Sequence, residues 1–488
     1  MRKLWLTLGL TWLLAFATAQ PVVVMQSADA VTLDPTMNRE TPTFNVLVNL
    51  FDALLFKEPD GSFSPGLATA WEAVDDTTWT FELREGVTFH NGEPFTAEAV
   101  VYTLERILDP ETESPIARGF SFITGVEAEG DYRVTVTTDG PQPLAETYFS
   151  DLLTVPTEHF EEVGAEAFAQ SPVGTGPYAF VSWQPDVALE LRANPDYWRG
   201  PANVTELTFR PVPEALTRFS SLSAGEADLI TGVPPSLTEA VEAAPNAALA
   251  TVESARVIYI GINTLQAGPL QDARVRQALN YAVDVNAIAE GIFGGLATPT
   301  TTLLTSADFG YTDAVSPYTY DPERARELLA EAGYADGFDL TLGTPNGRYT
   351  NDVQVAQAVA AQLGEVGVRV TPEVREYGAY VGDLFAKNAP DLFLIGWGNA
   401  PLDADFILYP LLRTDGLLSY YSNPELDALL DTGHTTLDES VRAAAYVDAL
   451  TIIQAEAPMI FLYKQVDAYG VSSRLSWTPR ADEFLWLY

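Results

Sequence analysis

Residues 338–374 decide the fold class, and their sequence is FDLTLGTPNGRYTNDVQVAQAVAAQLGEVGVRVTPEV. The pattern predicts a strand at Phe338–Leu342, a loop at 343–351, a helix at Asp352–Val366 and a second strand at Val368–Val374. A helix between two such strands is typical of a βαβ unit, whose strands are parallel. We therefore expect an α/β protein.

The pattern continues on both sides of this unit. A further strand is expected at Asp391–Ile395, and Asp272, Asp284 and Asp321 each occupy the position of a helix N-cap. Arg256–Asn263 is expected to be a buried strand. The half of the chain before residue 260 mixes short strands with fewer helices.

This arrangement suggests where a ligand binds. In open α/β sheets, ligands bind beyond the carboxyl ends of strands, near helix N-termini. The loop 343–351 carries Arg348 and Tyr349 before a helix, so the helix N-terminus would add positive potential for an anion. The loop after Ile395 carries Trp397, Asn399, Asp403 and Asp405. A cation on one loop and acids with an aromatic face on the other suit a zwitterionic or amphipathic small ligand. The alternatives are a surface role for Arg348 and core packing for Trp397.

Composition excludes several functional classes. The chain has 488 residues, 47% of them hydrophobic, so we expect two or more domains. Its net charge of −41 argues against binding to nucleic acid or to anionic lipid. The chain contains no cysteine, which excludes disulfides, thiolate metal sites and a cysteine nucleophile.

The first 19 residues have the pattern of a cleavable signal peptide. Arg2 and Lys3 precede an apolar stretch at Leu4–Phe16, and Ala17-Thr18-Ala19 forms a small-x-small cleavage site. No later stretch has ~18 uninterrupted apolar residues. We expect an exported protein that begins at Gln20, carries no lipid anchor, does not insert into the membrane and resides in the periplasm.

Catalytic and metal-binding motifs are missing. The three histidines, His90, His159 and His434, are far apart, and no H-E-x-x-H, P-loop or G-x-S-x-G motif is present. We therefore expect no metal, no cofactor and no catalytic residue. A secreted hydrolase is kept as a remote alternative.

A long run at Pro65–Arg106, PGLATAWEAVDDTTWTFELREGVTFHNGEPFTAEAVVYTLER, closely resembles the signature of family 5 extracellular solute-binding proteins. These are the dipeptide-, oligopeptide- and nickel-binding proteins of ABC importers. Further matching motifs follow in order along nearly the whole mature chain: LDPT (33–36), PVGTGPY (172–178), NPDYW (194–198), GEADL (225–229), VRQALNYAVD (275–284) and NPELD (423–427).

The resemblance implies a two-lobed periplasmic-binding-protein fold of type II (cluster C) with a two-strand hinge. Lobe I would comprise residues 20–52, 174–262 and 465–488, with a subdomain, 53–173, inserted in it. Lobe II would comprise 263–464. The hinge candidates are Arg256–Asn263 and Ile460–Tyr469.

The resemblance also implies site residues. Arg348 matches by context the arginine that binds a peptide carboxylate, whereas the position of the amine-anchoring aspartate is occupied by Ala400. Either Asp403 or Asp405 replaces that anchor, or the ligand lacks a free amine. Trp397 and Tyr421 would form apolar walls, and Asn399 a polar contact. Asn38, Glu40 and Thr41 would contact the ligand from the first lobe.

The expected function is capture of a peptide or a peptide-like solute, such as a glutathione-like compound, by hinge closure. The partner would be an inner-membrane ABC permease, and the protein would be a monomer. An oligosaccharide or another non-peptide solute is the alternative ligand, and presentation of the ligand to a receptor is an alternative role.

Overall fold

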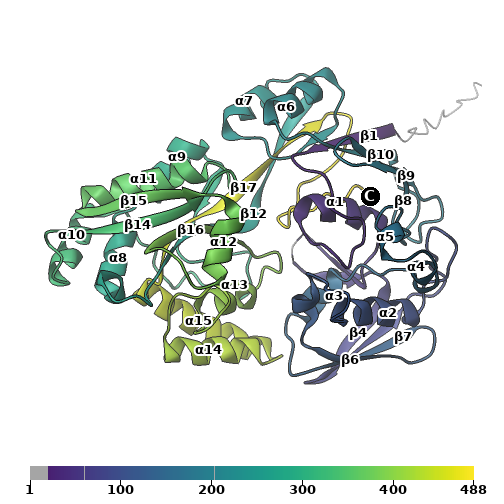
Figure 1. Cartoon of the computed structure of the whole chain (residues 1–488), viewed down its shortest axis with the longest axis horizontal. Helices are drawn as coiled ribbons and strands as arrows, with labels where there is room; N and C mark the ends of the chain where they lie inside the picture. Colours follow the sequence, from purple (N-terminus) through teal and green to yellow (C-terminus); the bar gives the residue numbers. More distant parts are fainter. Residues whose placement is uncertain (1–19, 60, 203) are drawn as a thin grey trace, which may run out of the picture.

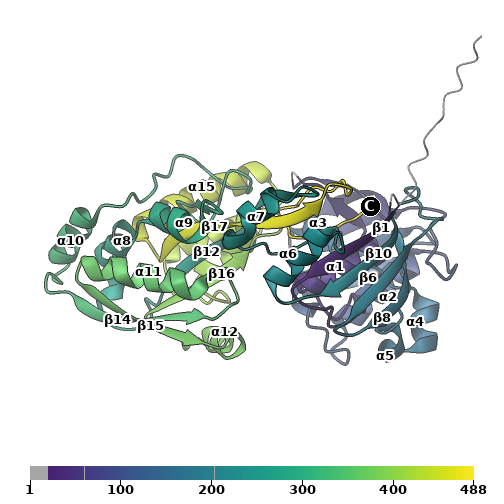
Figure 2. The same ribbon diagram turned by 90° about the horizontal axis from the view of Figure 1, so that it is seen from above.

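The computed structural model describes residues 20–488 except 60 and 203, so the expected signal peptide lies outside the described residues. Two lobes lie side by side (Figures 1 and 2). The first lobe contains the N-terminal elements and the C-terminal tail, and the second contains most of the elements after residue 262.

One large sheet runs through both lobes. In the described residues its strand order is β15-β14-β16-β12-β17-β11-β1-β10-β9-β8, and β13 pairs with β17 off this path. The bounds are β1 Gln20–Gln26, β8 Tyr178–Gln184, β9 Ala188–Ala193, β10 Val204–Pro211, β11 Leu229–Ile230, β12 Ala247–Ile262, β13 Ala297–Pro299, β14 Phe338–Pro345, β15 Val368–Arg375, β16 Leu392–Gly398 and β17 Met459–Ser472. The sheet is mixed, with parallel β14–β15 and antiparallel β12–β17.

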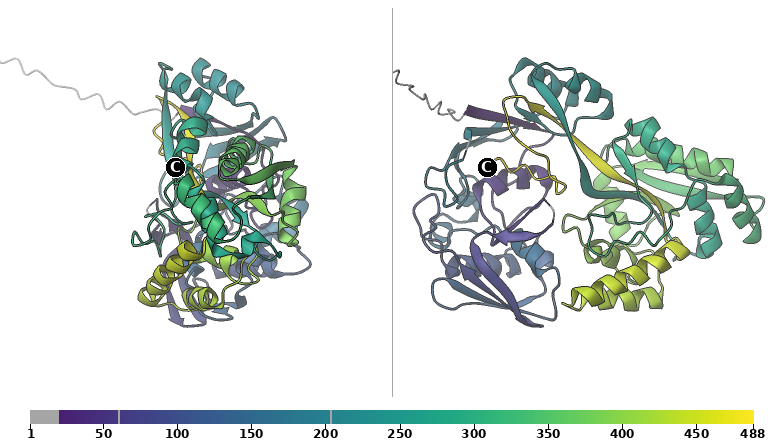
Figure 3. Two further views of the ribbon diagram at one scale, coloured as in Figure 1. Left: turned by 90° about the vertical axis from the view of Figure 1, so that its left-hand side faces the viewer. Right: turned by 180° about the vertical axis from the view of Figure 1, so that it is seen from behind.

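Strands β12 and β17 connect the lobes. They pair antiparallel, and the register shifts twice, between Glu253 and Val257 and again between Ile258 and Tyr259 of β12. Before the first shift, β17 also pairs with β11 of the first lobe, and from Arg256 onward β12 also pairs with β16 of the second lobe. Figure 3 shows both strands passing from one lobe into the other. A break in the ladder at this point lets the two halves of the sheet bend relative to each other. The expected hinge segments, Arg256–Asn263 and Ile460–Tyr469, lie within these two strands except for Asn263, which follows β12.

The second lobe contains the expected βαβ unit, β14–α11–β15, with parallel strands. Its helices are α8 Ala273–Tyr281, α9 Val285–Phe293, α10 Pro322–Glu331, α11 Asp352–Glu365, α12 Tyr377–Phe385, α13 Ala404–Leu412, α14 Pro424–His434 and α15 Glu439–Glu456, with a short 3-10 turn at Pro269–Gln271. Asp272, Asp284 and Asp321 cap α8, α9 and α10, as predicted. The expected loop boundary was wrong, because 343–345 continue β14 by pairing with Glu373–Arg375.

The first lobe carries a second, smaller sheet of order β4-β5-β7-β6. These strands are β4 Ala68–Asp75, β5 Thr78–Leu83, β6 Ile123–Ala128 and β7 Arg133–Thr138, and β2 Leu55–Lys57 pairs with β3 Phe63–Pro65 beside them. The helices are α1 Thr41–Leu50, α2 Ala97–Leu108, α3 Ala145–Ser150, α4 Thr157–Val163, α5 Ala165–Phe168, α6 Ala215–Ala224 and α7 Thr238–Glu242, with 3-10 turns at Ala117–Phe120 and Pro235–Leu237. The small sheet packs around its own core, which includes Phe81, Phe95 and Phe149.

We expect Gly261→Ala to lower the free energy of unfolding by about 1–3 kcal/mol, the usual cost of overpacking a core. Gly261 lies in β12 under the ring of Phe393, and a Cβ there would come within 2.1 Å of that ring. Urea unfolding measures the loss. Gly291→Ala in α9 is the control, because its Cβ would meet nothing within 4 Å. Equal stability of the two variants would contradict this packing.

Candidate ligand-binding site

Connected cavities lie between the two lobes. The hinge cavity, of about 730 Å³, lies where β12, β17, α1 and the loop before α11 meet. The aromatic cavity, of about 720 Å³, lies between 115–148 of the first lobe and 397–434 of the second. A smaller cavity of about 200 Å³ joins them, since it shares residues with each, including Arg39 and Phe406.

Charges of both signs line the hinge cavity. Its cations are Arg39, Arg256 and Arg348, and its acids are Glu40, Asp467 and Glu483. Arg39 forms an ion pair with Asp151, and Arg256 Nε lies 3.3 Å from Glu483 Oε1. Among the described residues, Arg348 has no carboxylate within 4 Å, so its guanidinium is available to an anionic ligand.

The backbone of the loop before α11 is fixed by Asp352. The carboxylate of this residue accepts hydrogen bonds from the backbone N–H groups of Gly347, Arg348 and Tyr349 at 3.1, 3.0 and 3.2 Å. These three loop amides are therefore already partnered and are not free for a ligand. The Arg348 side chain is the remaining cationic group of this loop.

Two tyrosines hold the Arg348 guanidinium by cation–π contacts. Its Cζ lies 5.1 Å from the ring centre of Tyr349 and 5.3 Å from that of Tyr377. Tyr349 is buried, and its hydroxyl donates a hydrogen bond to the Gly396 carbonyl at 3.2 Å. Tyr349 therefore packs its ring against the Arg348 guanidinium and links the loop to β16 through its hydroxyl. Tyr377 lines the cavity itself.

The aromatic cavity is largely apolar, and Trp397 forms part of its wall with Tyr148, Phe406 and Tyr409. The indole N–H of Trp397 donates to the Phe406 carbonyl at 2.9 Å, which orients the ring. Trp397 and Arg348 thus line different cavities. A ligand that contacts both must extend through the connecting cavity.

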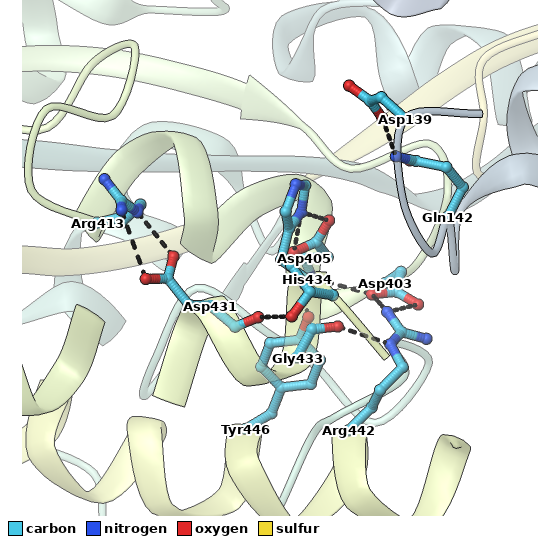
Figure 4. A network of polar contacts seen from close by, with 11 residues as sticks. Asp139, Gln142, Asp403, Asp405, Arg413, Asp431, Gly433, His434, Arg442 and Tyr446 are labelled. Atoms are coloured by element: carbon cyan, nitrogen blue, oxygen red, sulfur yellow. Dashed lines mark hydrogen bonds and ion pairs between the residues drawn. The ribbon is translucent and has the colours of Figure 1, made fainter. Parts of the chain in front are cut away.

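Asp403 is held inside the second lobe by Arg442 (Figure 4). Arg442 Nη2 donates to the two carboxylate oxygens of Asp403 at 2.8 and 3.0 Å, and Arg442 Nε donates to the Gly433 carbonyl at 2.9 Å. Asp403 also caps α13. Burial raises the pKa of Asp403 to about 6, although the guanidinium acts in the opposite direction. The carboxylate is thus committed to a structural ion pair.

Asp405 and Asn399 also have partners within the lobe. Asp405 accepts a hydrogen bond from the Tyr446 hydroxyl at 3.2 Å, and His434 Nδ1 lies 2.9 Å from it. Asn399 is buried and donates to Asp308 Oδ1 at 2.8 Å. Asp405 reaches the aromatic cavity, whereas Asp403 lines a separate cavity near residues 307–309.

The remaining predicted residues are divided between cleft and interior. Glu40 and Thr41 line the hinge cavity. The side chain of Asn38 instead accepts a hydrogen bond from the Glu40 backbone N–H at 2.7 Å and shapes the turn before α1. Tyr421 is buried in the core of the second lobe, where its ring centre lies 5.6 Å from Arg276 Cζ, and it lines none of the four cavities described above.

The family model described as bacterial extracellular solute-binding proteins, family 5 Middle, matches residues 62–418. The chain belongs to this family. The two-lobed arrangement around a shared cleft is the fold of this family's solved structures, so the predicted fold class is confirmed.

Three comparisons place the protein within family 5. It is 32% identical over 467 residues to a glutathione-binding protein of Pectobacterium atrosepticum, covering 91% of this chain and 88% of the relative. It is 31% identical over 456 residues to heme-binding protein A of Haemophilus influenzae, covering 86% of this chain and 82% of that relative. The protein also superposes with a TM-score of 0.80 on the periplasmic binding protein DppA of Helicobacter pylori, which was solved in complex with the peptide STSA. The two are 27% identical, and the match covers 96% of this chain and 97% of DppA.

Sequence reasoning missed Arg39, Arg256, Tyr377, Asp467 and Glu483, which the fold brings into the hinge cavity of this family 5 protein. Arg256 and Asp467 are charged residues within largely apolar strands, and a charge at such a position can indicate a polar cleft. Glu483 carries no local signal, because it reaches the cavity from the C-terminal tail.

Neither membrane spans nor metal clusters are found in the described part of the chain. No helix there combines the length and apolar character that crossing a bilayer requires. No three His, Asp or Glu side chains in that part gather closely enough to bind a metal ion.

Proposed function

We propose that this family 5 protein is the periplasmic binding component of an ABC importer and captures a peptide or peptide-like solute between its lobes. The hinge cavity carries the proposal, because between the two lobes it combines carboxylates with Arg348, an arginine that forms no ion pair within the described part of the chain. A solute with both an anionic and a cationic group, such as a short peptide or glutathione, matches this charge pattern. Relatives that bind glutathione and a peptide support it.

The size of the cleft supports the same class of solute. A cavity of about 730 Å³ lies within the ~300–1,000 Å³ range of small-ligand sites. In our proposal, Arg348 binds the carboxylate of the solute, and Glu40 and Thr41 contact it from the first lobe. Trp397 provides an apolar wall for a longer solute that reaches the aromatic cavity.

Hinge closure would trap the solute. We propose lobe boundaries at residues 20–52, 174–262 and 465–488 for lobe I, 53–173 for its inserted subdomain and 263–464 for lobe II. The lobes already touch at the Lys57 ammonium, which donates to the Ala400 carbonyl across the cleft. A ligand that bridges Arg348 and the first lobe would favour the closed arrangement, in line with other hinge-closing proteins.

The protein would act as a monomer that delivers its solute to permease subunits, without catalysis. An oligosaccharide is the second candidate, and the aromatic wall around Trp397 favours it, because sugars stack on such side chains. The charge of the hinge cavity favours the peptide-like solute over a neutral sugar.

Native mass spectrometry of residues 20–488, purified without denaturation, tests the proposal. We expect a bound peptide-like compound that is released on unfolding. A solute at a hundredfold excess over its dissociation constant should stabilise the refolded protein by about 2.7 kcal/mol. Recovery of a sugar, together with the absence of any stabilisation by peptides or glutathione, would contradict the peptide proposal.

A further inference from the structure

Two carboxyl groups lie at the junction of the lobes, Asp467 of β17 and Glu483 of the C-terminal tail, and both line the hinge cavity. The oxygens of Glu483 are partnered. Ser254 Oγ donates to Oε1 at 3.1 Å, the Arg256 guanidinium pairs with the same oxygen, and the Thr41 hydroxyl donates to Oε2 at 3.4 Å.

Asp467 differs from Glu483 in its partners. Gln465 Nε2 donates to Oδ1 of Asp467 at 2.6 Å, but Oδ2 is buried and has no hydrogen-bond partner among the described residues. Asp467 also has no cationic nitrogen within 4 Å in the described part of the chain. A buried carboxylate that has one unpartnered oxygen and no close cation is costly, so such a group calls for a compensating cation.

The charged groups around Asp467 do not supply an ion-pair partner. Arg256, on β12, lowers the pKa of Asp467 from beyond ion-pair distance, but its guanidinium is paired with Glu483. Arg39, just before α1, is paired with Asp151. Arg348 approaches the cavity from the second lobe, held by Tyr377, whereas Glu40 adds a further negative charge. Burial raises the pKa of Asp467 to about 7, and the neighbouring Glu483 carboxylate raises it in the same direction.

We propose that Asp467 binds a cationic amine of the ligand at the hinge, while Arg348 binds its anionic end. This inference rests on the proposed function and narrows the solute to one that carries both groups. It removes the need for Asp403 or Asp405 as the amine partner, and those carboxylates are already committed within the second lobe. An N-blocked acid or a neutral sugar would leave Asp467 without its partner.

Calorimetric titration with matched probes tests this assignment. The probes are glutathione and trialanine, each with its N-acetylated counterpart. We expect wild-type protein to bind the free amines at least about tenfold more tightly, the scale of one charge-assisted hydrogen bond. Asp467→Asn, which keeps the shape of the side chain, should reduce this preference to about threefold or less. Asp339→Asn, on an exposed part of β14, should leave it unchanged.

Proton release provides a second measurement. An ammonium beside Asp467 favours the ionised carboxyl, so its pKa falls and protons are released on binding near pH 7. Titrations in two buffers of different ionisation enthalpy measure this release, which Asp467→Asn should diminish.

The outcomes separate the two claims. Wild-type protein that binds the N-acetylated and free forms equally would overturn the Asp467 assignment and leave the peptide-binding function intact, and this result needs no variant to fold. An undiminished preference for the free amines in Asp467→Asn would likewise overturn the Asp467 assignment and leave the peptide-binding function intact. Failure of wild-type protein to bind any of the four probes would overturn the proposed function and this inference with it.

Discussion

Arg442→Met is expected to lower the free energy of unfolding by about 3–5 kcal/mol, the usual cost of removing one partner of a buried ion pair. The side chains of Arg442 and Asp403 are 5% and 10% exposed. The substitution leaves the Asp403 carboxylate buried without its cation and also removes the hydrogen bond to the Gly433 carbonyl. Urea unfolding of each variant, followed by tryptophan fluorescence, measures the loss.

The pH dependence and two matched variants make this prediction specific. Without the guanidinium, the pKa of Asp403 should rise further, so the loss should grow as pH increases through that pKa and shrink below it. The double variant Asp403→Asn, Arg442→Met should recover part of the stability. Arg413→Met breaks a more exposed pair with Asp431, at 34% and 43% exposure, and should cost below about 1 kcal/mol. Equal effects of Arg442→Met and Arg413→Met would refute a structural role for the Asp403 pair.

Arg348→Ala is expected to weaken binding of glutathione or a tripeptide by about 1.5–3 kcal/mol, or roughly 10- to 150-fold in the dissociation constant. No carboxylate of the described protein neutralises this guanidinium, and two tyrosine rings hold it at the hinge cavity. The variant should fold normally, because the side chain is exposed and Asp352 fixes only its backbone. Isothermal titration calorimetry measures the change.

Arg369→Ala is the matched control for this loss. Arg369 is an exposed arginine of the same lobe, on β15, and pairs with Asp339 away from the cavities. Its removal should leave the affinity for the solute unchanged. Arg348→Lys should retain part of the affinity, because a lysine ammonium keeps the positive charge but lacks the planar set of donors of a guanidinium. Unchanged affinity in Arg348→Ala would exclude Arg348 as the carboxylate partner.

Much of the fold could be predicted from local sequence patterns. The unit at 338–374 was predictable because its strand and helix periodicities are clear, and the aspartates at 272, 284 and 321 cap helices through contacts only two or three residues away. The extent of β12 was not predictable. Its first seven residues, 247–253, are held in the sheet by β17, about 220 residues later in the chain.

The roles of the acidic residues in the site depend on contacts with residues that are distant in the sequence. Asp403 and Asp405 have the appearance of ligand-binding acids in the sequence, but Arg442 and His434 reach them from α15 and α14. Conversely, Asp467 and Glu483 come together only because the C-terminal tail returns to the hinge. Residue types near the carboxyl ends of β14 and β16 pointed to Arg348 and Trp397, which line the cavities, whereas the partners of each acid required the structure.

Calorimetric titration of wild-type residues 20–488 with glutathione, di- and tripeptides and a set of oligosaccharides is the decisive experiment for capture of a peptide-like solute. We expect saturable, one-to-one binding of at least one free-amine peptide or of glutathione, and no binding of the neutral sugars. Binding of an oligosaccharide with no response to any peptide or to glutathione would contradict it.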